Sequence, residues 1–128
     1  MDKALFQAWL DRYLEAWQSY DATAIGDLFS ENVEYRYHPW DDPVRGREAV
    51  VRDWVDNRDA EGSWRASYRA HSVDGDLAVA TGTSDYLTDD RSAVDRTYHN
   101  VFLCRFDTDG RCSSFTEYFM QEPKAAVS

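Results

Sequence analysis

Apolar positions near the start of the chain recur at spacings of three and four, which is the period of an amphipathic helix. They are Leu5, Phe6, Trp9, Leu10, Tyr13, Leu14 and Trp17. Asp2 is placed to cap this helix, and Asp21 to cap a shorter second helix. The second helix is expected to direct three apolar side chains to the core: Ile25, Leu28 and Phe29. A third helix is predicted over residues 47–57, where apolar positions again follow the helical period.

The remaining segments alternate between apolar and polar positions, which predicts strands with one buried face. The first strand covers residues 33–37, and the prolines at positions 39 and 43 prevent its continuation. Four further strands are predicted over residues 64–73, 77–87, 95–106 and 112–121. The Asp74-Gly75 pair is typical of a hairpin turn, so the first two of these four strands are expected to be antiparallel neighbours.

This order of elements, α-α-β-α-β-β-β-β, predicts the α+β class. We expect three N-terminal helices packed on a curved, mixed but mostly antiparallel sheet, which together form a cone-shaped α+β barrel. The open end of such a cone is a natural place for a small-molecule cavity. The length of 128 residues fits a single domain, with its core at about residues 4–122 and a mobile tail at residues 123–128.

Charge and composition narrow the classes of partner. The net charge of −10 predicts repulsion from nucleic acids and from anionic membranes. Cys104 and Cys112 do not form a CxxC pair, and the N-terminus has no signal-type apolar block, so a cytoplasmic protein with free thiols is expected. Without histidine pairs at ligand spacing or a glycine-rich phosphate loop, the sequence predicts neither a metal nor another cofactor.

Several stretches together resemble the nuclear transport factor 2 superfamily, and within it the SnoaL-like and ketosteroid-isomerase-like branch. The most recognisable is Pro-Val-Arg-Gly-Arg-Glu-Ala-Val at residues 43–50, supported by Arg12-Tyr13 and by residues 21–29, 33–37 and 105–119. The resemblance implies the cystatin-like cone fold. It also implies a homodimer through the outer face of the sheet. Relatives on this fold include isomerases, epoxide hydrolases, dehydratases, polyketide cyclases and non-catalytic binding modules.

The ketosteroid isomerase mechanism needs a tyrosine, a general-base aspartate and a protonated aspartate. Tyr13 matches the tyrosine, but the base position falls on or beside Tyr37 and the second aspartate position falls near Phe102. The resemblance therefore does not predict ketosteroid isomerase activity. Polyketide cyclases of the SnoaL type rely on a polar acid/base group in an otherwise aromatic pocket, and this looser requirement excludes less.

Two residues are candidates for acid/base catalysis. Glu117 alternates with Phe115 and Phe119 on the inward face of the last strand, where desolvation would raise its pKa. The alternative is that Glu117 pairs with Arg45 or with the Tyr13 hydroxyl. His38, at the end of the first strand, is either a proton shuttle at the cavity mouth or an ordinary loop histidine.

Other inward-facing residues are candidates for a ligand pocket. Asn100 shares a strand face with Tyr98, Phe102 and Cys104, and it either anchors a ligand carbonyl or satisfies a buried backbone group. The aromatic candidates are Tyr13, Trp17, Tyr35, Tyr37, Trp40, Trp54, Tyr98, Phe102, Phe115 and Phe119. Core packing is the alternative for all of them, and it is favoured for the helix residues Trp9 and Trp17.

The outer face of the sheet is predicted to be unusually apolar. Its residues are Thr97, His99, Val101, Leu103, Thr116, Tyr118 and Met120, and such a stripe indicates a homodimer. Three functions stay open: a cofactor-independent isomerase, lyase or cyclase that uses acid/base chemistry, a non-catalytic pocket for a small apolar or polycyclic molecule, and a dimerisation module with a vestigial cavity.

Overall fold

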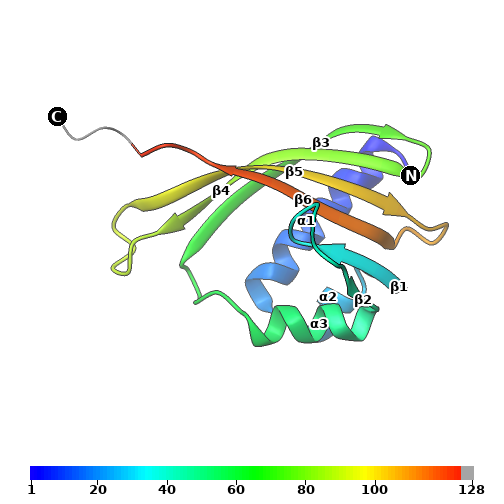
Figure 1. Cartoon of the computed structure of the whole chain (residues 1–128), viewed down its shortest axis with the longest axis horizontal. Helices are drawn as coiled ribbons and strands as arrows, with labels where there is room; N and C mark the ends of the chain where they lie inside the picture. Colours follow the sequence, from blue (N-terminus) through cyan, green and yellow to red (C-terminus); the bar gives the residue numbers. More distant parts are fainter. Residues whose placement is uncertain (125–128) are drawn as a thin grey trace.

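The computed structural model describes residues 1–124, and the elements follow the chain as Figure 1 shows. The helices are α1 (Lys3–Ser19), α2 (Ala22–Gly26) and α3 (Arg47–Asp56). The strands are β1 (Phe29–Arg36), β2 (Val44–Arg45), β3 (Trp64–Asp74), β4 (Leu77–Leu87), β5 (Val94–Phe106) and β6 (Cys112–Gln121). The predicted tail, residues 123–128, has its last four residues outside the described part of the chain.

The six strands form one sheet in the order β2-β1-β6-β5-β4-β3. Only β1 and β6 are parallel, and every other neighbouring pair is antiparallel. In Figure 1 the long strands arch over α1, and α3 lies across the open side of the arch. The predicted α+β fold is therefore confirmed as three helices packed on a mixed, curved and unclosed sheet.

The helix caps are as the sequence predicts. The Asp2 carboxylate accepts a hydrogen bond from the backbone N–H of Leu5 at 2.8 Å, and that of Asp21 accepts from Ala24 at 2.9 Å. Such caps satisfy backbone donors that have no partner within the helix.

The prediction that the second helix carries Leu28 and Phe29 is wrong, because α2 ends at Gly26. Both side chains are buried, but they leave the helix to join the sheet. Phe29 pairs with Cys112, whose backbone N–H donates to the Leu28 carbonyl at 2.9 Å. Because of this pairing with β6, β1 begins at Phe29, four residues before the start that the alternation of apolar residues predicts.

The sequence also missed β2, which is too short for an alternation pattern. Its two residues return the chain to the edge of β1, where Val44 pairs with Tyr35 and Arg45 with Glu34. The later strands lie within one residue of their predicted bounds at each end. Parallel pairing of β1 with β6 stops at Thr116, so the last part of β6 has a neighbouring strand only on its β5 side.

One half of the space between the sheet and the helices is a dense aromatic core. Trp9 is fully buried there, and its ring centre lies 6.2 Å from that of Phe6 and 5.3 Å from that of Phe106. The indole N–H of Trp9 donates to the Leu28 carbonyl at 3.0 Å, so the polar atom of this side chain is satisfied. Among the described residues, no helix is both long and apolar enough to span a membrane.

Candidate functional site

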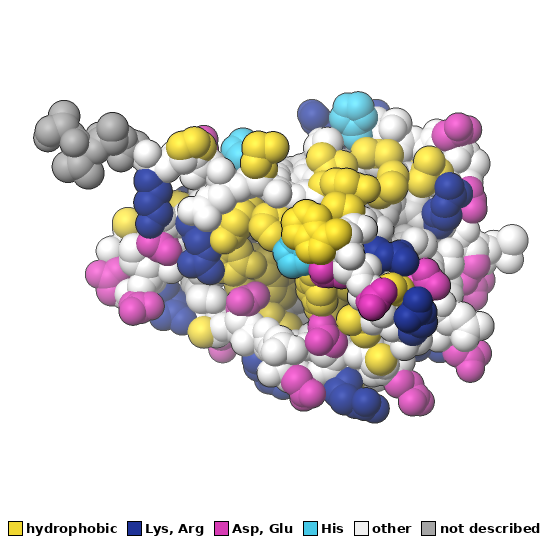
Figure 2. Space-filling view, in the orientation of Figure 1, with side chains coloured by type: hydrophobic (Ala, Val, Ile, Leu, Met, Phe, Trp, Pro, Cys, Tyr) yellow, Lys and Arg dark blue, Asp and Glu magenta, His cyan; other side chains and the backbone are white. Residues whose placement is uncertain are grey.

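The other half of this space is hollow, with a cavity of about 350 Å³. Figure 2 shows that this face of the molecule is hollowed, with hydrophobic side chains inside and charged side chains of both signs around the opening. The lining comes from α1, β1, the end of α3, β3, β4 and β6. It consists of Tyr13, Trp17, Tyr20, Tyr35, Tyr37, Asp53, Trp54, Asn57, Asp59, Tyr68, Ser84, Tyr86 and Glu117.

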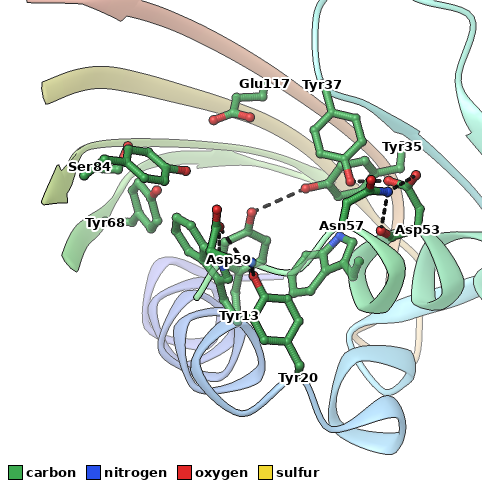
Figure 3. A pocket seen from close by; sticks show the side chains of 13 residues that line it. Tyr13, Tyr20, Tyr35, Tyr37, Asp53, Asn57, Asp59, Tyr68, Ser84 and Glu117 are labelled. Atoms are coloured by element: carbon green, nitrogen blue, oxygen red, sulfur yellow. Dashed lines mark hydrogen bonds between the residues drawn. The ribbon is translucent and has the colours of Figure 1, made fainter. Parts of the chain in front are cut away.

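Glu117 lies at the cavity wall (Figure 3). Its carboxylate is held there by hydrogen bonds that run across three strands. The Asn100 amide donates to the Glu117 carboxylate at 2.9 Å, and the Ser84 hydroxyl donates to the Asn100 amide oxygen at 3.1 Å. The Ser84 bond fixes the Asn100 amide with its NH₂ group toward Glu117. Burial raises the pKa of Glu117 to about 7, although the Asn100 bond and the nearby His38 lower it.

Two buried tyrosines meet inside the cavity from different elements (Figure 3). Tyr13 of α1 and Tyr35 of β1 have their hydroxyl oxygens 3.3 Å apart. Burial raises the pKa of both phenols well above the ordinary value, and the charge of Glu117 raises both further. Both hydroxyls therefore stay protonated near neutral pH and can donate hydrogen bonds.

Tyr68 extends the hydroxyl-bearing wall along β3. Its ring occupies the space beside Gly82 of β4, where an added Cβ would lie 2.5 Å from the Tyr68 ring and 2.1 Å from the Ser67 carbonyl oxygen. Glycine at this position therefore permits the two strands and the Tyr68 ring to approach closely. Burial, the largest cause, and the charge of Glu117 raise the pKa of Tyr68.

Two aspartates complete the lining, each bound by neutral donors. The Tyr37 hydroxyl donates to Asp53 of α3, and burial together with this bond raises the pKa of Tyr37. The Asp59 carboxylate accepts from the indole N–H of Trp17 at 3.0 Å and from the Tyr20 hydroxyl at 3.4 Å. These bonds fix the segment after α3 against the end of α1.

Comparison with known proteins identifies the family. The model of the SnoaL-like domain matches residues 10–115. The chain belongs to this family. Among curated proteins, none matches the chain.

Solved structures agree with the fold of a SnoaL-like domain. An NTF-2 like protein of unknown function from Burkholderia xenovorans LB400 has a TM-score of 0.72 and 16% identity over 98% of this chain and 91% of that chain. A ketosteroid isomerase-like protein from Kribbella flavida DSM 17836 has a TM-score of 0.66 and 16% identity over 98% of this chain and 85% of that one. At this identity the likeness shows the shared architecture alone.

The SnoaL-like fold brings only part of the predicted site together. Tyr13, Trp17, Tyr35, Tyr37, Trp54 and Glu117 line the cavity. Phe102 and Phe115 lie behind it in the core, with ring centres 5.5 Å and 5.7 Å from that of Tyr13. Asn100 contacts the cavity through its bond to Glu117.

Four further predicted residues, His38, Trp40, Tyr98 and Phe119, lie away from the cavity. His38 stacks on Trp40 with ring centres 4.9 Å apart, and its Nδ1 lies 2.8 Å from the Asp41 carboxylate. Trp40 is 79% exposed. The Tyr98 ring packs edge-on against Phe119, which is itself 43% exposed.

A second hollow of about 750 Å³ lies on the other side of β6 and is called here the outer groove. His38, Trp40 and Phe119 border it, together with Val101, Tyr118 and Met120 of the outer sheet face. Glu117 borders both the cavity and the outer groove.

The alternative partners considered for Glu117 are engaged elsewhere. The Arg45 guanidinium lies 3.9 Å from Glu34 on the strand beside it, and the Tyr13 hydroxyl is bonded to Tyr35. In the described part of the chain, Glu117 has no salt bridge and its carboxylate accepts only the Asn100 bond.

Sequence reasoning missed seven residues of the lining: Tyr20, Asp53, Asn57, Asp59, Tyr68, Ser84 and Tyr86. Alternation could have found Ser84 and Tyr86, which share the inward face of β4 with the buried Ala80. Asp59 carries no such signal, because it follows α3 in a segment without periodicity. No cluster of His, Cys, Asp and Glu suited to a metal ion occurs among residues 1–124.

Proposed function

We propose that this SnoaL-like domain binds a small molecule in the cavity and performs acid/base chemistry on it with Glu117. The observation that carries the proposal is a carboxyl group with a pKa of about 7 at the wall of a cavity rich in tyrosine hydroxyls. A group with such a pKa is half protonated near neutral pH, so it can both accept and return a proton.

The roles of the other residues follow from their bonds. The Tyr13–Tyr35 pair can donate to a carbonyl oxygen and stabilise the negative charge that develops when a neighbouring C–H proton is removed. Glu117 would take that proton and deliver it to another atom of the same molecule. Asn100 is a positioning residue, because it orients the carboxylate through its 2.9 Å bond. Isomerisation, cyclisation and dehydration all use such a transfer.

The test uses the planar ketone 2-tetralone as a probe of proton abstraction. The protein is expected to catalyse deuterium incorporation next to the carbonyl in D₂O, followed by NMR. Glu117→Gln should lower the catalysed rate by about 100-fold or more. The wild-type rate should rise with pH through about 7, as the carboxylate forms.

The matched control is Glu15→Gln, which makes the same chemical change at an exposed position of α1. This variant should catalyse deuterium incorporation into 2-tetralone at the same rate as the wild type. Equal exchange by Glu117→Gln and wild type would exclude acid/base catalysis by Glu117. Saturable binding of 2-tetralone without catalysed exchange would instead support a non-catalytic binding module.

A homodimer through the outer groove is proposed as the assembly. Tyr118 and Met120 are 43% and 75% exposed on the outer sheet face, and Trp40 adds a further exposed ring beside them. A second copy of the chain would remove this apolar surface from water. Light scattering should give twice the chain mass at micromolar concentration, and Met120→Glu should shift the particle toward the monomer.

A further inference from the structure

All charged side chains in the cavity lining are acidic. Asp53, Asp59 and Glu117 contribute carboxylates, and the lining contains no Lys, Arg or His. Within residues 1–124, none of the three carboxylates forms a salt bridge. Their hydrogen-bond donors are neutral groups: phenols, an indole and amides. Among the described residues, no cationic side chain therefore forms an ion pair with these three carboxylates.

Two carboxylate oxygens are also free of hydrogen bonds in the described part of the chain. The Oδ2 atom of Asp59 accepts both the Trp17 and the Tyr20 bonds, which leaves Oδ1 without a donor. The Oε1 atom of Glu117 accepts the Asn100 bond, which leaves Oε2 without a donor. Each free oxygen can accept an N–H bond from a ligand.

The walls suit a positive charge for a second reason. Aromatic rings attract cations to their faces, and tyrosine and tryptophan rings form most of this lining. The guanidinium groups of Arg58 and Arg96 already lie 5.6 Å and 4.6 Å from the ring centres of Tyr20 and Tyr86, so the other lining rings are the ones left for a ligand cation.

The buried tyrosine pair points independently to a ligand. Tyr13 and Tyr35 are 6% and 2% exposed, and their two hydroxyls share a single hydrogen bond. Two phenols carry two protons, so one O–H is left without an acceptor among the described residues. Because both residues line the cavity, an oxygen atom of a bound molecule, or water in its absence, can accept this hydrogen bond.

We infer that the cavity selects an organic ammonium compound with an aromatic body and an oxygen acceptor at its far end. The ammonium group is bound by the free oxygen of Asp59 and by the ring faces, the oxygen accepts from the Tyr13–Tyr35 pair, and Glu117 stays available for proton transfer. Molecules with a carboxylate or phosphate are rejected by the three acidic side chains. This inference rests on the proposed function, since it names the substrate class of the same cavity.

The experiment uses four probes of one shape that differ in charge and in the oxygen atom. They are tyramine, 4-ethylphenol, 3-(4-hydroxyphenyl)propanoate and phenethylamine. Binding is followed at pH 7 and low salt by NMR of the tryptophan indole N–H groups. The Trp17 signal should move with tyramine, because this group bonds to Asp59, whereas the exposed Trp40 outside the cavity serves as the internal control.

Tyramine is expected to bind about tenfold more tightly than 4-ethylphenol, which lacks the ammonium group. The propanoate should bind about 100-fold more weakly than tyramine. Phenethylamine, which lacks the oxygen, should bind a few-fold more weakly than tyramine. Raising the salt concentration should weaken the binding of tyramine and leave the binding of 4-ethylphenol unchanged.

Asp59→Asn removes the charge while its amide oxygen can still accept from Trp17 and Tyr20. This variant should weaken the binding of tyramine about fivefold or more and leave the binding of 4-ethylphenol unchanged. Asp53→Asn, which lies on a different element, should also weaken the binding of tyramine. The control is Asp56→Asn, which changes the net charge equally at an exposed position outside the lining; it should bind all four probes like the wild type.

The inference is overturned if 4-ethylphenol or the propanoate binds as tightly as tyramine, if no probe binds, or if both cavity variants bind tyramine unchanged. The 2-tetralone exchange separates this failure from that of the proposed function. If the protein shows no preference for tyramine but still catalyses Glu117-dependent exchange, only the assignment of an ammonium ligand is wrong. If the protein prefers tyramine but catalyses no exchange, only the catalytic role of Glu117 is wrong.

Discussion

The two halves of the space under the sheet use aromatic residues in opposite ways. Around Trp9 the rings belong mainly to phenylalanine and pack to exclude water, and the single indole N–H is bonded to the Leu28 carbonyl. Around Glu117 most rings carry a hydroxyl, and a cavity of about 350 Å³ remains. Rings without polar atoms can fill a space completely, whereas hydroxyls need partners and so hold it open for water or a ligand.

The packed half should be the less tolerant of truncation. Trp9→Ala removes a fully buried ring that contacts Phe6, Phe29 and Phe106, so it should lower the free energy of unfolding by about 3–5 kcal/mol. Urea denaturation measures this loss. The comparison is Trp17→Ala, whose ring lies at the cavity and is partly exposed; a loss equal to that of Trp9→Ala would contradict the contrast between the halves.

The hollow half should gain stability when its buried charge is removed. Folding raises the pKa of Glu117 from the ordinary 4.5 to about 7, so between these pH values the folded protein holds a proton that the unfolded chain has released. The contribution of Glu117 to stability therefore falls as pH rises through this range. Above pH 7 the ionised group costs up to about 3 kcal/mol.

Glu117→Gln should accordingly be more stable than the wild type at pH 8, and the difference should vanish near pH 4. Thermal unfolding at a series of pH values provides the measurement. A difference that stays constant between pH 4 and pH 8 would show that Glu117 has an ordinary pKa in the folded protein.

The close contact at Gly82 should tolerate no added carbon. Gly82→Ala places a Cβ 2.1 Å from the Ser67 carbonyl oxygen, so the strands or the Tyr68 ring must shift, at a cost of about 1–3 kcal/mol. The shift should also weaken ligand binding at the cavity wall. Thr83→Ala, on the outward face of the same strand, serves as the control in urea denaturation and should cost less.

The smallest effect is expected from a single hydroxyl. Tyr35→Phe keeps the ring stacked on Phe115 but removes the bond to Tyr13, so it should lower the free energy of unfolding by about 1 kcal/mol. The same variant should slow 2-tetralone exchange, because the donor pair is lost. Unchanged exchange would remove the tyrosine pair from the proposed mechanism.

Periodicity explains which parts of the molecule could be predicted. The spacing of apolar residues gave the buried face of α1 and the bounds of β4 and β6, because these elements bury one face over many residues. It also placed Glu117 between Phe115 and Phe119 on the inward face. The predicted bounds failed at α2 and β1, where pairing with β6 overrides the helical spacing of Leu28 and Phe29.

The parts of the cavity that were missed lie where periodicity gives no information. Asp59 is held by Trp17 and Tyr20, contacts that join residues about forty positions apart and leave no local pattern. Trp40 was predicted as an aromatic residue of the ligand pocket, but the loop after β1 carries its side chain to the outer groove. A sequence pattern shows which face of an element is buried, and it does not show the course of a loop.

The pairing of β1 with β6 stops at Thr116, and this affects how Glu117 contacts solvent. From Glu117 onward, β6 has a neighbouring strand only on its β5 side. Glu117 borders both the cavity and the outer groove. Because Glu117 borders both spaces, a molecule bound in the cavity does not by itself separate this residue from the solvent on the other side of β6. A dimer formed over the outer groove would cover Glu117 on that side, so occupancy of the cavity and assembly would together control its contact with water.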